Sequence, residues 1–330
     1  MKAIALLSGG LDSILAAKLV LDEGIEVEAL NFLTVFCNCT TKDSTCLSSK
    51  SAADQLKINL KVLEVSREYL NIVKNPSHGY GRNLNPCIDC RIFMLKKAGE
   101  YMRENGASFL VTGEVLGERP MSQRMEAIKL IEKESGMEDL ILRPLSAKLF
   151  PPTIPEKEGW VNREKFLAIK GRSRKPQIRL AEELGIKDYP CPAGGCLLTD
   201  KDFSGRMRDL MKFNPDFIVK DVKLLKLGRQ FRLNPLAKLI VGRNEKENIR
   251  LAELAEESDF CFNPREVKGP TGLGRGTFSR EALSLSSQII ARYSDKNGSK
   301  SVEVICNNKK DTCTLSAEPI EEEKLLSIRI

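Results

Sequence analysis

The sequence LLSGGLDSILAAKL at residues 6–19 places a glycine-rich turn between an apolar run and a helical pattern. Glycines let the chain turn sharply off a strand and bring backbone N–H groups against a ligand. The following helix directs its partial positive N-terminus at the same point, which favours a phosphate, and Ser8 and Ser13 add hydroxyl donors. Asp12 would repel phosphate unless a magnesium ion lay between them, so the turn predicts a metal-bound nucleotide. The alternative is an ordinary turn in which Asp12 or Ser13 caps the helix.

Short apolar runs alternate with amphipathic helical patterns from residue 1 to about 145. Strands separated by such helices form βαβ units, so we predict an α/β fold with a parallel sheet and helices on both faces. Ligands of such sheets bind at the carboxyl ends of the strands. Four prolines in residues 144–155 indicate a connector. We therefore expect a first domain at 1–150, a connector at 151–200 and a smaller basic α+β region at 201–330.

Cysteine and histidine usage limits the chemistry of the chain. No stretch approaches the roughly 20 apolar residues of a membrane span, and the first strand begins too early for a signal peptide. We therefore expect a cytoplasmic protein without a membrane partner, in which ten cysteines are metal ligands or reactive thiols. The single histidine, His78, excludes a His-rich zinc site, and we expect it to be a loop residue. The net charge of +7 permits an anionic partner.

The glycine turn resembles the signature SGGxDS of the PP-loop ATP pyrophosphatase family. All its fixed positions are matched, by Ser8, Gly9, Gly10, Asp12 and Ser13. The resemblance implies that these residues bind ATP with Mg²⁺ and that residues 1–150 are an ATP-binding catalytic domain. It also implies cleavage of ATP between the α and β phosphates, with adenylation of a substrate oxygen and release of pyrophosphate.

A second segment, FLVTGEVLGERPMSQ at residues 109–123, resembles the tRNA 4-thiouridine synthetases of that family, as does LILRPL downstream. This resemblance implies that Thr112, Gly113 and Glu114 end a strand beside the nucleotide. The alternative is a strand followed by an ordinary glycine loop.

Two cysteine segments lie about a hundred residues apart. NPCIDCR contains Cys87 and Cys90 just before a predicted helix, whose end would favour the thiolate form, and YPCPAGGCLLTD contains Cys191 and Cys196. The two segments resemble those of the tRNA 2-thiouridylases, in which two essential cysteines meet across the active site. Cys90 and Cys196 match those two positions and are thereby predicted to be catalytic, together with Asp12. In iron-sulfur-dependent tRNA thiolases, three cysteines at such positions hold a 4Fe-4S cluster.

Three interpretations of these cysteines stay open. Cys87, Cys90 and Cys196 would hold a 4Fe-4S cluster with one open iron, which we favour. Alternatively, two reactive thiols would carry and resolve a persulfide. In the third, all four cysteines would form a closed structural zinc site, since paired cysteines are also a zinc signature.

A further group, FCNCTTKDSTC, follows the second predicted strand and contains Cys37, Cys39 and Cys46. Its spacing is weak evidence for a second metal or a sulfur relay, and ordinary loop cysteines are the alternative. Cys261 and Cys306, like Cys313, have no such spacing.

Basic residues cluster in two later stretches. Residues 163–179 and 220–243 each carry seven basic residues and one acidic residue. Such residues gain affinity for RNA through counterion release, although a charge run is also typical of a solvated helix face. We predict RNA contacts at Arg172, Arg174 and Lys175. GPTGLGRG at 269–276 is expected to be a flexible loop with Arg275 along an RNA backbone.

These features together predict an ATP-dependent tRNA uridine sulfurtransferase. A uridine carbonyl oxygen would be adenylated, and sulfur from the cysteine centre would then displace AMP. The ATP-binding segments favour the 4-position, and the 2-position stays open. Sulfide or a cysteine desulfurase persulfide would supply the sulfur, and a homodimer stays open. The alternatives are a sulfurtransferase or amidotransferase for a small molecule, and an RNA-binding protein with a structural zinc site.

Overall fold

The computed structural model describes residues 1–37, 47–190, 196–295, 298–309 and 311–330. The chain divides into two compact units, Met1–Thr199 and Asp200–Ile330. Residues 151–199, in the predicted connector, are therefore part of the first unit. None of the helices in the described ranges combines the length and apolar content that a membrane crossing requires.

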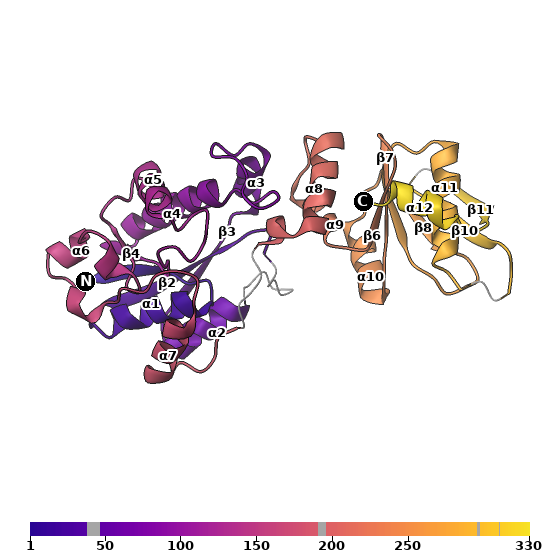
Figure 1. Ribbon diagram of the computed structural model, residues 1–330. Helices are drawn as coiled ribbons and strands as arrows, with labels where there is room; N and C mark the ends of the chain where they lie inside the picture. Colours follow the sequence, from indigo (N-terminus) through magenta and orange to yellow (C-terminus); the bar gives the residue numbers. More distant parts are fainter. Residues whose placement is uncertain (38–46, 191–195, 296–297, 310) are drawn as a thin grey trace. The chain divides into compact units, whose positions relative to one another are not determined.

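The first unit is a five-stranded sheet with the order β3-β2-β1-β4-β5, in which every pairing is parallel (Figure 1). Its strands are β1 (Lys2–Leu6), β2 (Glu26–Leu33), β3 (Leu60–Glu64), β4 (Phe109–Val111) and β5 (Ile141–Leu142). Its α-helices are α1 (Leu11–Leu21), α2 (Leu47–Leu56), α3 (Ser66–Lys74), α4 (Cys87–Glu104), α5 (Met125–Ser135), α6 (Ile154–Lys157) and α7 (Lys175–Glu183).

Helices cover both faces of this sheet. Helices α1, α2 and α7 lie on one side of the sheet and α4 and α5 on the other (Figure 1). Ala3 and Ala5 of β1 belong to the core shared with α1, α2 and α7, whereas Ile4 belongs to a second core shared with α4 and α5. This alternation follows from the two-residue period of a strand. The predicted parallel α/β fold is confirmed. The predicted nucleotide residues lie in the loops that follow β1 and β4 and in the first turn of α1.

The second unit is a six-stranded antiparallel sheet with the order β11-β10-β8-β9-β7-β6. Its strands are β6 (Arg229–Asn234), β7 (Ala237–Val241), β8 (Phe260–Pro264), β9 (Gly272–Gly276), β10 (Val302–Asn307) and β11 (Thr312–Ala317). Its helices are α8 (Lys201–Phe213), α9 (Val219–Leu225), α10 (Glu245–Leu254), α11 (Arg280–Arg292) and α12 (Glu322–Ile328). Helix α11 packs on the core of Phe231 and Phe262, and α10 packs on a smaller core around Ile240. The predicted α+β character of this region is confirmed.

The expectation of a flexible loop at residues 269–276 is wrong. Residues 272–276 form β9, which pairs with both β7 and β8. Arg275 makes ion pairs with Asp259 at 2.6 Å and with Asp221 at 2.7 Å, and its side chain is only 18% exposed. Its guanidinium is therefore engaged within the unit.

Lys238 on β7 is a buried cation with an unusual pH dependence. Burial lowers its pKa from 10.5 to about 8, and Asp209, 3.4 Å away, offsets this only in part. Between these pH values the unfolded chain binds a proton that the folded chain does not, so the free energy of unfolding rises with pH across that window. We expect Lys238→Met to remove this rise and to raise stability at neutral pH by about 1–3 kcal/mol. Urea unfolding at about pH 7 and about pH 10 measures both effects. Equal pH slopes for the variant and the wild type would contradict this account.

Candidate active site

The turn between β1 and α1 is held by its own polar groups. The Gly10 N–H donates to Ser8 Oγ at 3.3 Å, and Ser13 Oγ donates to the Gly10 carbonyl at 2.8 Å. Gly9 has φ +80°, and a β-carbon there would lie 2.4 Å from the Ser48 backbone, so only glycine fits. Gly10 is the N-cap of α1 and no side chain caps this end, which rules out Asp12 or Ser13 as the cap. Because no side chain makes the N-cap hydrogen bond of α1, N–H groups of its first turn are left to bind an anion.

Asp12 is a half-buried carboxylate on the first turn of α1. Burial raises its pKa, and the nearby Arg174, Gln177 and Arg119 oppose that shift only in part. Its Oδ1 is buried and has no hydrogen-bond partner within the described residues. A buried carboxylate oxygen without a partner suits a hard cation such as Mg²⁺, which supports the predicted metal role of Asp12.

Two residues of the segment around α7 face Asp12. Helix α7 packs against α1, and Arg174 is its N-cap residue. Gln177 is fully buried, and neither its Nε2 nor its Oε1 has a partner within the described ranges. Arg174, predicted for RNA, therefore lies at the nucleotide turn, whereas Arg172 and Lys175 are exposed. The basic composition of the stretch concealed this difference, and no sequence signal marked Gln177.

Gly113, after β4, lies directly against the turn. A β-carbon at this position would lie 2.5 Å from the backbone carbonyl of Asp12 and from the Ser13 nitrogen. Thr112, which precedes it, is buried. The predicted nucleotide residues of the two segments are therefore brought together at one edge of the sheet.

We expect Gly113→Ala to displace the first turn of α1, because backbone atoms cannot yield as a flexible side chain can. ATP binding should weaken by about tenfold or more, and stability should fall by about 1–3 kcal/mol. Gly205→Ala on α8 is the matched control, since a β-carbon there meets nothing within 4 Å, and it should stabilise α8 by up to about 1 kcal/mol. Calorimetric ATP titration and thermal unfolding measure these effects. Unchanged ATP affinity in Gly113→Ala would show that this contact does not shape the site.

Glu114 lies at the centre of a buried ion network. Its carboxylate pairs with Arg91 at 3.0 Å and with Arg143 at 2.9 Å, and Thr112 donates to it at 3.3 Å. Burial alone would raise its pKa, but the two arginines hold that pKa below its usual range. Arg91 adjoins Cys90 in α4, so Glu114 ties the end of β4 to the cysteine-bearing helix.

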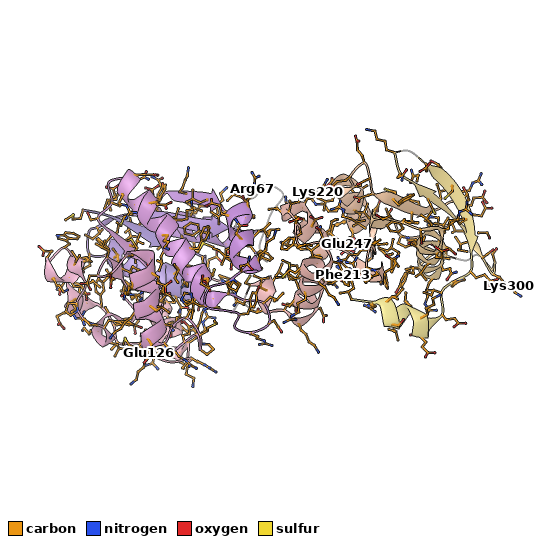
Figure 2. The ribbon with its side chains drawn as sticks, turned by 90° about the horizontal axis from the view of Figure 1, so that it is seen from above. Arg67, Glu126, Phe213, Lys220, Glu247 and Lys300 are labelled. Carbon is orange, nitrogen blue, oxygen red and sulfur yellow. The ribbon has the colours of Figure 1, made fainter. Side chains whose placement is uncertain are left out.

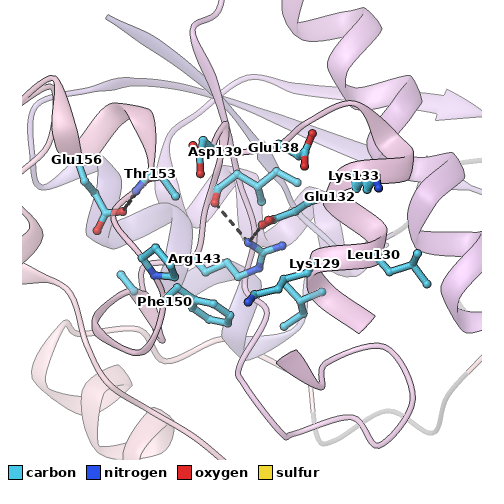
Figure 3. A pocket seen from close by; sticks show the side chains of 14 residues that line it. Lys129, Leu130, Glu132, Lys133, Glu138, Asp139, Arg143, Phe150, Thr153 and Glu156 are labelled. Carbon is cyan, nitrogen blue, oxygen red and sulfur yellow. Dashed lines mark hydrogen bonds and ion pairs between the residues drawn. The ribbon is translucent and has the colours of Figure 1, made fainter. Parts of the chain in front are cut away.

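Arg143 also borders a cavity of about 420 Å³ beside α5, shown in Figure 3. Two of its charged lining residues, Arg143 and Glu132, pair with each other, and Glu156 accepts from the Thr153 N–H (Figure 3). Glu156 also pairs with Arg163, which does not line the cavity. This cavity is lined by none of the predicted site residues, and we assign no ligand to it.

Cys87 and Cys90 lie on the first turn of α4, and the segment of Cys196 approaches the turn that follows β2. Asn85 Nδ2 donates to Cys87 Sγ at 2.8 Å. Cys196 Sγ donates to the Phe36 carbonyl at 3.6 Å, and the Leu197 N–H donates to the same oxygen at 3.3 Å. The Cys196 thiol thus lies beside the loop that carries Cys37.

The described cysteines of this unit influence one another's ionisation. Burial raises the pKa of Cys196 to about 12, and Cys90, Cys37 and Cys87 add to that shift. Burial also raises the pKa of Cys90, against hydrogen bonding from Tyr69 and the charge of Arg91. Cys90, Cys37 and Cys87 are therefore near enough to Cys196 to act on its ionisation, which supports the predicted convergence of Cys90 and Cys196.

The expectation that the helix end favours thiolates at Cys87 and Cys90 is wrong. Burial raises the pKa of Cys87 as well, although Arg119, Asn85 and Arg91 oppose it. Desolvation outweighs the helix dipole here, so both sulfurs are neutral thiols at pH 7.

The cysteine sulfurs of this unit are chemically suited to bind a metal ion or a cluster. Zinc ions and iron-sulfur clusters prefer soft donors such as thiolates. Within the described residues, however, no three Cys, His, Asp or Glu side chains are arranged to hold one metal ion. The cysteine sulfurs therefore suit zinc or iron by their chemistry, but the described residues do not form a complete ligand set. Cys39, Cys46 and Cys191 lie outside the described residues.

His78 is a loop residue, as expected. Its Nδ1 lies 3.2 Å from Asp89 and its Nε2 lies 3.2 Å from Glu134, so it links the start of α4 to the end of α5.

Arg119, in the loop after β4, connects the two halves of the site. Its charge opposes the raised pKa of Asp12 and also that of Cys87. Arg119 is exposed, and its charge reaches both the nucleotide turn and Cys87. Sequence reasoning did not single out Arg119, although it belongs to the quoted segment at 109–123.

Two family models match the chain. Residues 1–148 match the model described as thiamine biosynthesis protein (ThiI), and residues 228–328 match the model described as NFACT protein RNA binding domain. The resemblance to PP-loop tRNA thiouridine synthetases is thus confirmed over residues 1–148.

Curated relatives include both kinds of tRNA thiolation protein. The chain is 32% identical over 146 residues to the probable tRNA sulfurtransferase of Thermoanaerobacter sp. (strain X514), which covers 44% of this chain and 36% of that protein. It is 29% identical over 130 residues to the tRNA-specific 2-thiouridylase MnmA of Petrotoga mobilis, which covers 35% of each. The chain spans about a third to just over half of the length of the curated relatives it matches.

Among solved structures, the U34-tRNA thiolase NcsA from Methanococcus maripaludis with its 4Fe-4S cluster is 18% identical, with a TM-score of 0.36 over 68% of this chain and 71% of that one. A 4-thiouridine synthetase in complex with RNA and ATP is 22% identical, with a TM-score of 0.37 over 56% of this chain and 51% of that one. Similarities at this level carry no argument about the site.

Proposed function

We propose, from the match of residues 1–148 to the ThiI family model, that this chain is an ATP-dependent tRNA uridine sulfurtransferase. The observation that carries the proposal is the position of Arg119, whose charge acts on both Asp12 and Cys87. A nucleotide turn and a group of thiols that share one neighbouring cation can act on the same substrate atom.

In the proposed reaction, the turn at 8–13 binds the phosphates of ATP and Asp12 binds its magnesium ion. A uridine oxygen attacks the α-phosphorus, and pyrophosphate leaves. Arg119 and Arg174 stabilise the charge that develops on the phosphate oxygens, because positive charges near the reacting phosphate oppose that charge. A sulfur nucleophile then attacks the base carbon, the carbon–oxygen bond breaks, and AMP carries the oxygen away.

The sulfur centre is proposed at Cys90 and Cys196, with Cys87 as the third ligand of a 4Fe-4S cluster. Such a cluster would present sulfide to the activated base. In the alternative without a cluster, Cys90 and Cys196 carry and resolve a persulfide. The free thiols of these cysteines are neutral and are therefore poor nucleophiles. In either form the nucleophilic sulfur would be anionic near neutral pH, because it would be bound to iron or to a second sulfur atom.

Metal analysis of protein purified without oxygen separates these forms. We expect about four iron and four sulfide per chain and a brown colour. Iron-free protein that still transfers sulfur from a desulfurase would establish the persulfide form. One zinc per chain, with neither iron nor sulfur transfer, would leave the structural zinc site and overturn the proposed sulfur centre.

The second unit is proposed to bind the tRNA. Residues 228–328 match an RNA-binding domain model, and the basic stretch at 220–243 adjoins and overlaps the start of that match. Attack at the 4-carbon is favoured by the ThiI match, and the 2-carbon is the alternative because of the 2-thiouridylase relatives.

The function is tested with the full chain, unmodified tRNA transcript, Mg²⁺-ATP and either sulfide or a cysteine desulfurase. Mass spectrometry of the digested tRNA is expected to show 4-thiouridine, with AMP and pyrophosphate formed in equal amounts. A 2-thiouridine product would correct the position only. ATP cleavage that depends on a small molecule, with no thionucleoside in the tRNA, would overturn the proposal.

A further inference from the structure

A cavity of about 220 Å³ lies within the second unit, between α8, α9 and strands β6, β7 and β9. Apolar side chains make up much of its wall, namely Leu210, Phe213, Leu224, Leu225, Leu236 and Ile240. An apolar cavity of about 150 Å³ accommodates a benzene ring, so this one has room for a single aromatic ring with polar substituents. Leu236 is 68% exposed, which leaves one apolar wall open to solvent.

Lys238 lines this cavity, and the carboxylate nearest to its ammonium group, that of Asp209, is shared with Arg232. The Lys238 side chain is 8% exposed, and its Nζ lies 3.4 Å from Asp209 without hydrogen-bond geometry to it or to any other residue in the described ranges. Asp209 is instead held by Arg232, which donates from Nε at 3.0 Å and from an Nη at 2.6 Å. A buried ammonium group without hydrogen bonds is costly, and an incoming acceptor would relieve that cost.

An arginine guanidinium and an aromatic ring form another part of the cavity wall. The Arg232 guanidinium lies 4.5 Å from the centroid of Phe213, the last residue of α8, which is labelled in Figure 2. Aromatic rings and guanidinium planes are the surfaces on which unpaired RNA bases stack.

We propose that this cavity binds one unstacked nucleobase of the RNA, with Lys238 donating to a carbonyl oxygen of the base. The inference rests on the proposed function, because that function supplies the RNA. The match of residues 228–328 to an RNA-binding domain includes Arg232 and Lys238, and the surrounding basic stretch at 220–243 offers phosphate contacts. A protonated amine only donates and therefore needs an acceptor on the base. Uracil and guanine offer carbonyl oxygens with two lone pairs, whereas adenine offers only ring nitrogens with one, so uracil and guanine are preferred.

The affinity test uses the full chain and labelled oligouridine or oligoadenosine of equal length, followed by fluorescence anisotropy. Lys238→Met should weaken oligouridine binding by about tenfold and oligoadenosine binding much less. Leu236→Ser, at an exposed position where folding is not at risk, should also weaken oligouridine binding. Lys324→Met on α12 is the matched control and should change neither.

Crosslinking gives an independent readout. RNA that contains 5-bromouridine is irradiated on the full chain, which is then digested with trypsin. The proposal expects crosslinks in the peptides 213–220 and 233–238. RNA binding with crosslinks only elsewhere and full affinity in Lys238→Met would overturn the inference and leave the proposed function standing. Absence of RNA binding together with absence of tRNA thiolation would remove the proposed function itself.

Discussion

The Cys196→Ser variant is expected to form no thiouridine while still releasing pyrophosphate from ATP in the presence of tRNA. Serine neither binds iron nor carries a transferable sulfur, so thiolation should fall by about 10³-fold or more. Adenylation should persist, because the nucleotide turn belongs to β1 and α1 and makes no contact through this thiol. Thionucleoside analysis and a pyrophosphate assay on the same samples measure the two steps separately.

Cys90→Ser should also lose thiouridine formation and keep pyrophosphate release, because Cys90 and Cys196 belong to the same group of thiols. The control is Cys313→Ser on β11, a half-buried cysteine of the second unit, which should leave both steps unchanged. Thiolation at the wild-type rate in Cys196→Ser would show that the convergence of these thiols has no part in sulfur transfer. Circular dichroism of each variant establishes that a loss is not due to unfolding.

The parallel sheet of the first unit could be predicted because the apolar pattern of each strand and the order of strands and helices indicate the same fold. The alternation of Ala3, Ile4 and Ala5 in β1 reads as a strand buried on both faces, and the turn at 8–13 marks the start of α1. Strands of this kind, separated by helices, form a parallel sheet whose carboxyl edge binds ligands. The placement of the predicted nucleotide residues at that edge follows from these two facts.

The roles of individual cations could not be read from charge alone. Arg172 and Arg174 are both arginines of the same basic stretch. Of the two, only Arg174 lowers the pKa of Asp12, because α7 packs against α1 and presents its first residues to the turn. Arg275 was misread because glycines around it suggested a loop. A β-carbon at Gly274 would lie 2.4 Å from Phe278, so glycine serves the packing of an aromatic ring on β9. Such close approaches involve residues that become neighbours only in the fold.

The ionisation of the cysteines was also out of reach from sequence. The first turn of a helix favours a thiolate by a modest electrostatic effect, whereas burial among other thiols disfavours it more strongly. The pKa of Cys90 depends on Tyr69 and Cys37, and that of Cys196 depends on Cys90 and Cys37, all of them far apart in the chain. The family resemblance indicated which sulfurs meet, and the fold determines how they ionise.

Asp12→Asn is expected to lower the activity and to raise the stability of the protein. The neutral amide is a poorer ligand for magnesium and does not balance its charge, so pyrophosphate release should fall by about 10²–10³-fold. Burial raises the pKa of Asp12, so the charged carboxylate costs stability as pH rises through that pKa. The variant lacks this cost, and without ATP or magnesium it should unfold at a higher urea concentration than the wild type at pH 7.

Asp22→Asn is the matched control, because Asp22 directly follows the same helix, is exposed and pairs only with Lys18 among the described residues. Its pyrophosphate release should be unchanged and its stability should differ by less than about 0.5 kcal/mol. A less stable Asp12→Asn variant would mean that Arg174 and Arg119 hold the carboxylate as a structural counter-ion. A variant with normal pyrophosphate release would remove the magnesium role. A more stable and inactive variant would indicate that the fold keeps an unfavourable buried charge for a cation that arrives with the nucleotide.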